Sequence, residues 1–182
     1  RSQLVYECKQ TTELNNVESL STLISEEFHL PRLGFGSMEA LLDYLFRRAE
    51  KEKMVLVLDE YPYLRETSAG IDSILQSLLD RNREVSSLKL ILCGSYVEIM
   101  KSLLARENPL YGRVDLTIDL KPMDYYESAM FYPDFSAEDK VRLYSVFGGI
   151  PYYNRLIDAS LSVKENIQEL IAAPGARPEN EV

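Results

Sequence analysis

Two adjacent carboxylates follow directly after an apolar run, and their chemistry is the most specific in the chain. The run is residues 54–58 (MVLVL), and the acids are Asp59 and Glu60. One carboxylate can hold a hydrated Mg²⁺ that contacts phosphate oxygens, while its neighbour orients or deprotonates a water molecule. The pair could therefore assist hydrolysis of a phosphate compound. The alternative is that both acids are merely solvated or cap the next helix.

The apolar run predicts the element that positions these acids. Charged residues precede it at 51–53, and Tyr61 and Pro62 follow it. A short aliphatic, β-branched run with such borders is typical of a strand buried on both faces, as in parallel sheets. Ligands of open parallel sheets bind outside the carboxyl ends of the strands. Asp59 and Glu60 are therefore expected at the functional edge of a sheet.

The remaining periodicity predicts an α/β fold. Further strands are expected at 3–8, 88–93 and 114–120, and helices at 17–28, 38–49, 71–83 and 97–104, with a loop at 61–70. Strands that alternate with helices imply right-handed crossovers and a parallel sheet. From Asp124 onward the pattern predicts helices alone, with a cap at Ser136, a helix end at Gly148 and a helix start at Pro151.

These patterns predict three regions. Residues 1–122 form a sheet-containing core, 123–173 a small helical lid and 174–182 a tail or linker. The chain begins with Arg and ends in a stretch rich in Pro, Gly, Asn and Glu, so we expect both ends to continue in a longer protein.

Composition limits the function classes. The 182 residues include 20 basic and 29 acidic side chains, a formal charge of -9, which argues against direct nucleic-acid binding by this segment. No apolar stretch approaches the roughly 20 residues of a membrane span. Cys8 and Cys93 lie in apolar runs without metal-ligand spacing, as expected of thiols in a reducing compartment. We therefore expect a cytoplasmic protein that does not bind membranes.

Several motifs in a fixed order resemble one family. Residues 55–64 (VLVLDEYPYL) match a Walker B strand, and 90–95 (LILCGS) match a sensor strand. The segments 108–113 (NPLYGR), 120–123 (LKPM) and 148–153 (GGIPYY) follow. Over about residues 3–160 the chain resembles the archaeal-type prokaryotic ATPases, a branch of the AAA+ and STAND P-loop NTPases. The resemblance implies a P-loop NTPase-like parallel sheet followed by a helical lid.

The resemblance also implies roles for individual residues. Asp59 helps to hold Mg²⁺, and Glu60 polarises the attacking water. Ser95 takes the place of the sensor of the γ-phosphate. Arg113 is a candidate for stabilising charge in the transition state, the alternative being a surface salt bridge. Pro151 corresponds to the proline that packs on adenine, the alternative being an ordinary proline at a helix start.

One departure from the family is large. The sequence contains no G-x-x-x-x-G-K-[ST], and none of its 8 glycines precedes a lysine. Without that loop the main source of affinity for the β- and γ-phosphates is absent. We therefore expect a fragment that starts after the family's Walker A strand and loop, with 3–8 as the second strand of the order 5-1-4-3-2. Strands 88–93 and 114–120 should then pair directly or through a partner copy, because unpaired buried backbone is costly.

Two classes of function follow. In the first, the parent protein binds ATP with Mg²⁺ and hydrolyses it, and the lid couples the nucleotide state to a conformational switch. In the second, the chain is a non-catalytic scaffold that binds protein or a second copy of itself. The resemblance also allows the ATPase part of a DNA-associated regulator. The paired acids favour the first class, since a scaffold has no physical reason to keep them.

Overall fold

The computed structural model describes residues 2–172, which divide into two compact units. Unit 1 extends to Thr117 and unit 2 begins at Ile118. The predicted tail, 174–182, and the last residue of the predicted lid lie outside the described residues. The predicted boundary between 122 and 123 stays a prediction.

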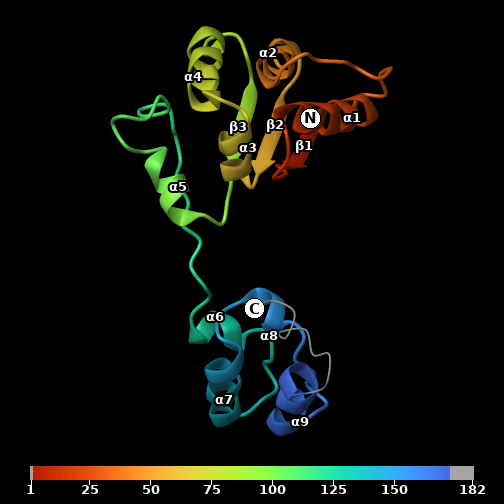
Figure 1. Cartoon of the computed structure of the whole chain (residues 1–182). Coiled ribbons are helices and arrows are strands. Elements are labelled where there is room, and N and C mark those ends of the chain that lie inside the picture. The colour runs from red at the N-terminus through yellow and green to blue at the C-terminus, as the bar shows by residue number, and fades with distance from the viewer. Residues whose placement is uncertain (1, 173–182) are drawn as a thin grey trace. The chain divides into compact units, whose positions relative to one another are not determined.

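Unit 1 is built on a parallel sheet of the strands β1 (Ser2–Glu7), β2 (Met54–Asp59) and β3 (Leu88–Leu92) (Figure 1). Their order is β1-β2-β3, so the strand that ends in Asp59 lies between the other two. Leu56 of β2 is in register with Leu4 and Leu90. The predicted α/β class and the order of these three strands are confirmed.

Three amphipathic helices cover one face of this sheet. They are α1 (Glu13–Glu27), α2 (Met38–Arg48) and α4 (Ile71–Asn82). Thr12 and Ser37 accept a backbone N–H at the starts of α1 and α2, as expected of N-cap residues. The alternate strand residues Leu4 and Leu56 are fully buried in the core that these helices complete. Side chains on the other face are open, since Val5 is 53% and Ile91 47% exposed.

The segment 61–70, predicted as a loop, instead starts with helix α3 (Tyr61–Thr67). Pro62 suggested a break in regular structure, but proline is tolerated in the first helical turn, where no intrahelical N–H bond is lost. Helix α5 (Val97–Ser102) is shorter than predicted. No helix within residues 2–172 combines the length and the apolar character that crossing a membrane requires.

The predicted strand at 114–120 is wrong. These residues form no strand in the structure, and the apolar members of the alternating pattern are exposed: Leu116 by 74%, Ile118 by 68% and Leu120 by 88%. A strand requires a neighbouring backbone to pair with. Within residues 2–172 β3 pairs with β2 alone, so the predicted direct pairing of 88–93 with 114–120 does not occur.

Unit 2 is helical, as predicted. It contains α6 (Tyr125–Ala129), α7 (Ala137–Phe147), α8 (Pro151–Asn154) and α9 (Val163–Ile167), which continues as a π-helical turn over Gln168–Ala172. Ser136 caps α7, Gly148 ends it with φ +62°, and Pro151 lies in the first turn of α8, all as expected. Helix α6 was not predicted from the sequence. A small core is built on Tyr132, Leu143 and Phe147.

Two motifs of unit 2 meet through their backbones. The Met123 N–H donates to the Gly149 carbonyl over 2.8 Å, and the Tyr144 hydroxyl donates to the Met123 carbonyl over 3.3 Å. A Cβ on Gly149 would lie 2.0 Å from the Met123 oxygen. Only glycine permits this approach, so the segments 120–123 and 148–153 depend on Gly149 for their contact.

The Gly149→Ala substitution should destabilise unit 2 by about 2–3 kcal/mol, because the new methyl group meets backbone atoms that cannot rotate away. Amide hydrogen exchange along α7 measures this loss. Gly36→Ala is the control, since its Cβ would meet nothing within 4 Å. Equal protection of α7 in both variants would contradict the prediction.

Candidate active site at the strand ends

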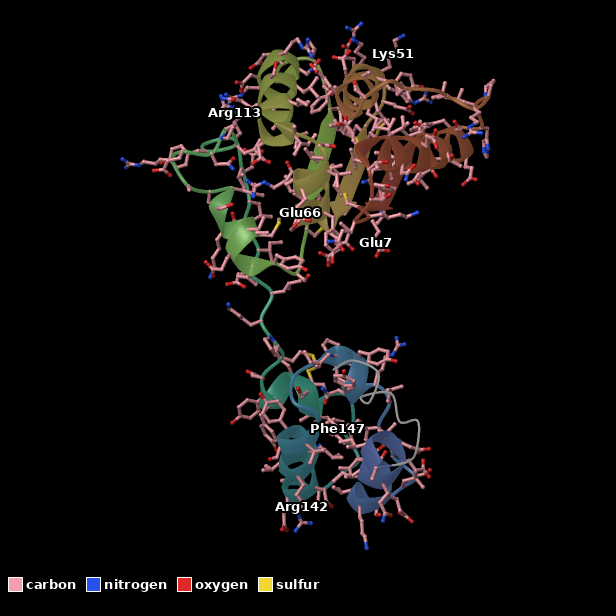
Figure 2. The ribbon with its side chains drawn as sticks, viewed as in Figure 1. Glu7, Lys51, Glu66, Arg113, Arg142 and Phe147 are labelled. Carbon is pink, nitrogen blue, oxygen red and sulfur yellow. The ribbon has the colours of Figure 1, made fainter. Side chains whose placement is uncertain are left out.

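The carboxyl ends of the parallel strands meet at one edge of the sheet. Glu7 at the end of β1 is in register with Asp59 at the end of β2, and Figure 2 shows Glu7 at this edge. Pairing continues past the strands, since the Cys8 N–H donates to the Asp59 carbonyl over 2.8 Å and the Cys93 N–H to the Leu58 carbonyl over 3.0 Å. Asp59 is thereby held between the two neighbouring strands.

Glu60 adopts a left-handed backbone conformation. Its φ is 48° and its ψ 43°, which is uncommon for a residue with a side chain. The Glu60 N–H donates to Asp59 Oδ1 over 3.0 Å. Although Glu60 precedes α3, its side chain makes no capping hydrogen bond to that helix. Backbone strain of this kind concentrates at functional sites.

The turn after β2 is locked to the turn after β3. The Tyr61 N–H donates to the Cys93 carbonyl over 2.9 Å. Gly94 packs on the Pro62 ring so closely that a Cβ there would lie 2.6 Å from Pro62 Cδ. These contacts bring the segments 59–62 and 93–95 together at the edge of the sheet.

Ser95 contacts Glu60 directly. The Ser95 hydroxyl donates to Glu60 Oε2 over 3.2 Å, and the Ser95 N–H makes a longer contact of 3.4 Å with the same oxygen. The structure thus groups three of the predicted site residues: Asp59, Glu60 and Ser95. Next to them, the rings of Tyr63 and Tyr96 meet edge to face at a centroid distance of 5.9 Å.

The carboxylate oxygens at this edge suit a hard cation such as Mg²⁺ that is held by few protein ligands. Burial, with the nearby Asp59 charge, raises the pKa of the Cys8 thiol to about 12. Burial raises the pKa of Cys93 as well, and Asp59 and Glu60 add to this shift. Both thiols are therefore neutral near pH 7 and are poor metal ligands. Residues 2–172 hold no cluster of three acid, Cys or His ligands, but Mg²⁺ commonly uses one or two carboxylates together with phosphate and water.

Arg113 is engaged elsewhere in unit 1. Its Nε and Nη2 donate to the two carboxylate oxygens of Asp80 on α4, over 2.8 and 2.7 Å. Its Nη1 donates to the carbonyls of Pro109 and Tyr111. The hydrogen bond from Arg113 lowers the pKa of Asp80, and the same contact raises the pKa of Arg113. This geometry is that of a salt bridge, the alternative role of Arg113 that the sequence left open. Figure 2 shows Arg113 beside α4.

Pro151, the predicted adenine contact, belongs to unit 2. It is exposed and lies in the first turn of α8, after Ile150. This placement fits an ordinary proline at a helix start. A role toward a nucleotide stays a prediction.

Sequence reasoning missed two residues that support this site. Gly94 lies in the segment 90–95 that was matched to a sensor strand, but its contact with Pro62 joins two distant parts of the chain and leaves no local pattern. Asp72 was one acid in the first turn of an amphipathic helix, yet it is buried and accepts hydrogen bonds from Tyr61 and Asn108. No local pattern could have identified Asp72, because its donors lie 11 and 36 residues away.

Comparisons with known proteins identify the family and the fold. Residues 5–156 match the model of a family described as an ATPase domain predominantly from Archaea. The fold is similar to that of the Walker-type ATPase of Pyrococcus abyssi, with a TM-score of 0.64 and 19% identity, over 92% of this chain and 60% of that one.

Two uncharacterised proteins of Methanocaldococcus jannaschii are also similar in sequence. The first is 31% identical over 100 residues, which are 54% of this chain and 23% of that protein. The second is 30% identical over 82 residues, which are 45% of this chain and 79% of that protein. The matched region is therefore only about a quarter of the first relative.

The Glu60→Gly substitution should stabilise unit 1 by about 1 kcal/mol, because glycine adopts the left-handed conformation without strain. Urea unfolding measures the change. Glu66→Gly is the control, since Glu66 is an exposed residue within α3 (Figure 2) and glycine inside a helix costs about 1 kcal/mol. A loss of stability in both variants would show that Glu60 is not strained.

The Gly94→Ala substitution should separate the two turns, since the new methyl group overlaps the Pro62 ring. We expect a loss of about 1–3 kcal/mol and faster hydrogen exchange of the Tyr61 amide. Gly34→Ala is the control, because a Cβ there meets nothing within 4 Å. An unchanged Tyr61 amide in Gly94→Ala would refute the proposed locking of the turns.

Proposed function

Because the chain belongs to the family of ATPase domains found predominantly in Archaea, we propose that it is part of an ATP-hydrolysing switch of the AAA+/STAND type. The observation that carries the proposal is the group of Asp59, Glu60 and Ser95 at the carboxyl edge of the parallel sheet. This is where an open α/β sheet binds its ligand.

In this proposal Asp59 holds Mg²⁺. One of its oxygens, Oδ1, accepts the Glu60 N–H, while no hydrogen bond from any residue in 2–172 reaches Oδ2. An oxygen at this position suits a metal that keeps most of its water and phosphate ligands. Bound Mg²⁺ would neutralise charge on the β- and γ-phosphates.

Glu60 acts as the base that orients and deprotonates the attacking water. Glu60 as a residue is partly buried, and its carboxylate accepts hydrogen bonds from Ser95 alone among the described residues. Ser95 thus lies next to the proposed base at the edge of the sheet. This position suits a sensor of the γ-phosphate. Arg113 and Pro151 keep the roles of transition-state cation and adenine contact within the proposal. For Arg113 that role requires release from Asp80.

The phosphate-binding loop, on this proposal, is supplied by polypeptide outside residues 1–182. Two features of the sheet support this. The outer edge of β3 has no strand partner within residues 2–172, and 114–120 keeps an alternating apolar pattern although its side chains are exposed. A strand supplied from elsewhere would pair with the free edge of β3, and pairing of 114–120 would bury its apolar side chains.

The free thiols Cys8 and Cys93 are consistent with a reducing cytoplasm.

The test is Mg²⁺-dependent ATP hydrolysis by a protein that joins this chain to a preceding strand and phosphate-binding loop. Glu60→Gln should lower kcat by at least about 100-fold and change the Kd for Mg-ATP by less than about threefold, because general-base catalysis contributes to turnover rather than to binding. Asp59→Ala should instead weaken the dependence of binding on Mg²⁺. Glu66→Gln, on the exposed side of α3, is the matched control and should behave as wild type.

Two results would overturn the proposal. Equal loss of binding and turnover in both acid variants would mean that Asp59 and Glu60 are structural. No ATP binding or turnover in any form would favour a non-catalytic scaffold, for which the exposed side chains of 114–120 offer an apolar contact surface.

A further inference from the structure

A second group of polar contacts, away from the strand ends, surrounds Asp72, the second residue of α4. Asp72 is 8% exposed. Its Oδ1 accepts the Tyr61 hydroxyl over 2.6 Å, and its Oδ2 accepts Asn108 Nδ2 over 2.8 Å and Arg65 Nη2 over 2.9 Å. One carboxylate thus receives three donors from two other parts of unit 1.

The first of these parts is the turn that carries Glu60. Tyr61 directly follows Glu60, and its side chain is fully buried. Its N–H is bound to the Cys93 carbonyl while its hydroxyl is bound to Asp72. Burial and the hydrogen bond to Asp72 raise the pKa of Tyr61, so the hydroxyl stays a donor. Tyr61 is therefore fixed at both ends, and the backbone of Glu60 is fixed with it.

The second part is the segment 108–113, which ends in Arg113. Asn108 donates to Asp72 and also accepts the Leu110 N–H over 2.8 Å, and Leu110 is buried in the core. At the other end of the segment Arg113 pairs with Asp80. Asp72 and Asp80 both lie on α4, so one helix holds both ends of the segment.

We propose that Asp72 is a positioning residue that joins the Glu60–Tyr61 turn to the Asn108–Arg113 segment, so that a change in one is transmitted to the other. A carboxylate is required because it alone offers two acceptor oxygens and a charge that balances Arg65. Asparagine would keep the shape of the side chain, but it would replace one acceptor by an N–H₂ group and leave Arg65 without its counter-charge. The effect of this link on catalysis rests on the proposed ATPase function, whereas the link itself does not.

Hydrogen exchange in the 182-residue chain tests the link without reference to activity. Asp72→Asn should accelerate exchange about tenfold at the Tyr61 amide and at the amides of Leu110 and Arg113, because local opening of both segments becomes easier. Asp43→Asn is the matched control. Asp43 also forms salt bridges with two arginines, Arg47 at 2.8 Å and Arg81 at 3.0 Å, but it contacts neither segment. A response confined to α4, or to only one of the two segments, would overturn the proposal.

Turnover tests the consequence for the active site, in the same loop-containing protein used to test ATP hydrolysis. Asp72→Asn and Tyr61→Phe should each lower kcat about tenfold and change the KM for ATP by less than about threefold, since misplacing Glu60 affects the chemical step rather than ground-state binding. The double variant should lose little more than either single one, because both changes act on the same link between the Glu60–Tyr61 turn and α4.

The two experiments separate the two proposals. Full kcat in Asp72→Asn, or a loss that appears only in KM, would refute the positioning role. Absence of turnover in the wild-type protein would refute the proposed function, and the exchange experiment would still decide whether Asp72 joins the two segments.

Discussion

The parallel pairing of β2 with a strand on each side is the constraint on which the rest of unit 1 depends. It aligns the buried Leu56 with the buried Leu4 and the partly buried Leu90 in one row, and the helices α1, α2 and α4 cover that row. The pairing continues beyond the strands through the Cys8 and Cys93 amides. Because all strands point the same way, their ends form one edge, and the side chains of Asp59 and Glu60 lie there.

The edge of the sheet tolerates a strained residue because its surroundings hold it. Glu60 has a positive φ and no capping bond. The residues after it are held by contacts from two directions: Cys93 and Gly94 from the turn after β3, and Asp72 from α4. A conformation that costs about 1–3 kcal/mol persists only under such support. The strain at Glu60 and the buried charge at Asp72 are thus parts of one arrangement.

The unpaired edge of β3 follows from the same pairing rule. β3 uses one edge for β2, and no residue in 2–172 pairs with the other. The segment 114–120 has the two-residue alternation of a strand but remains exposed. Alternation is a local property, whereas strand formation depends on hydrogen bonds to a distant backbone. The segment therefore has the pattern of a strand without its structure.

The sequence by itself determined the elements whose signals are local. Strands β1 to β3 appear as apolar runs, helices α1, α2 and α4 as amphipathic repeats, and Asp59 and Glu60 as two acids at a strand end. The order of the motifs singled out Ser95 as a sensor, and the tertiary structure brings its hydroxyl within 3.2 Å of Glu60 Oε2. Only the tertiary structure decided the positive φ of Glu60, the ion pair of Arg113 with Asp80 and the three donors to Asp72. These features depend on partners from other elements, 33 residues away for Arg113 and Asp80, and a local pattern contains no information about such distant contacts.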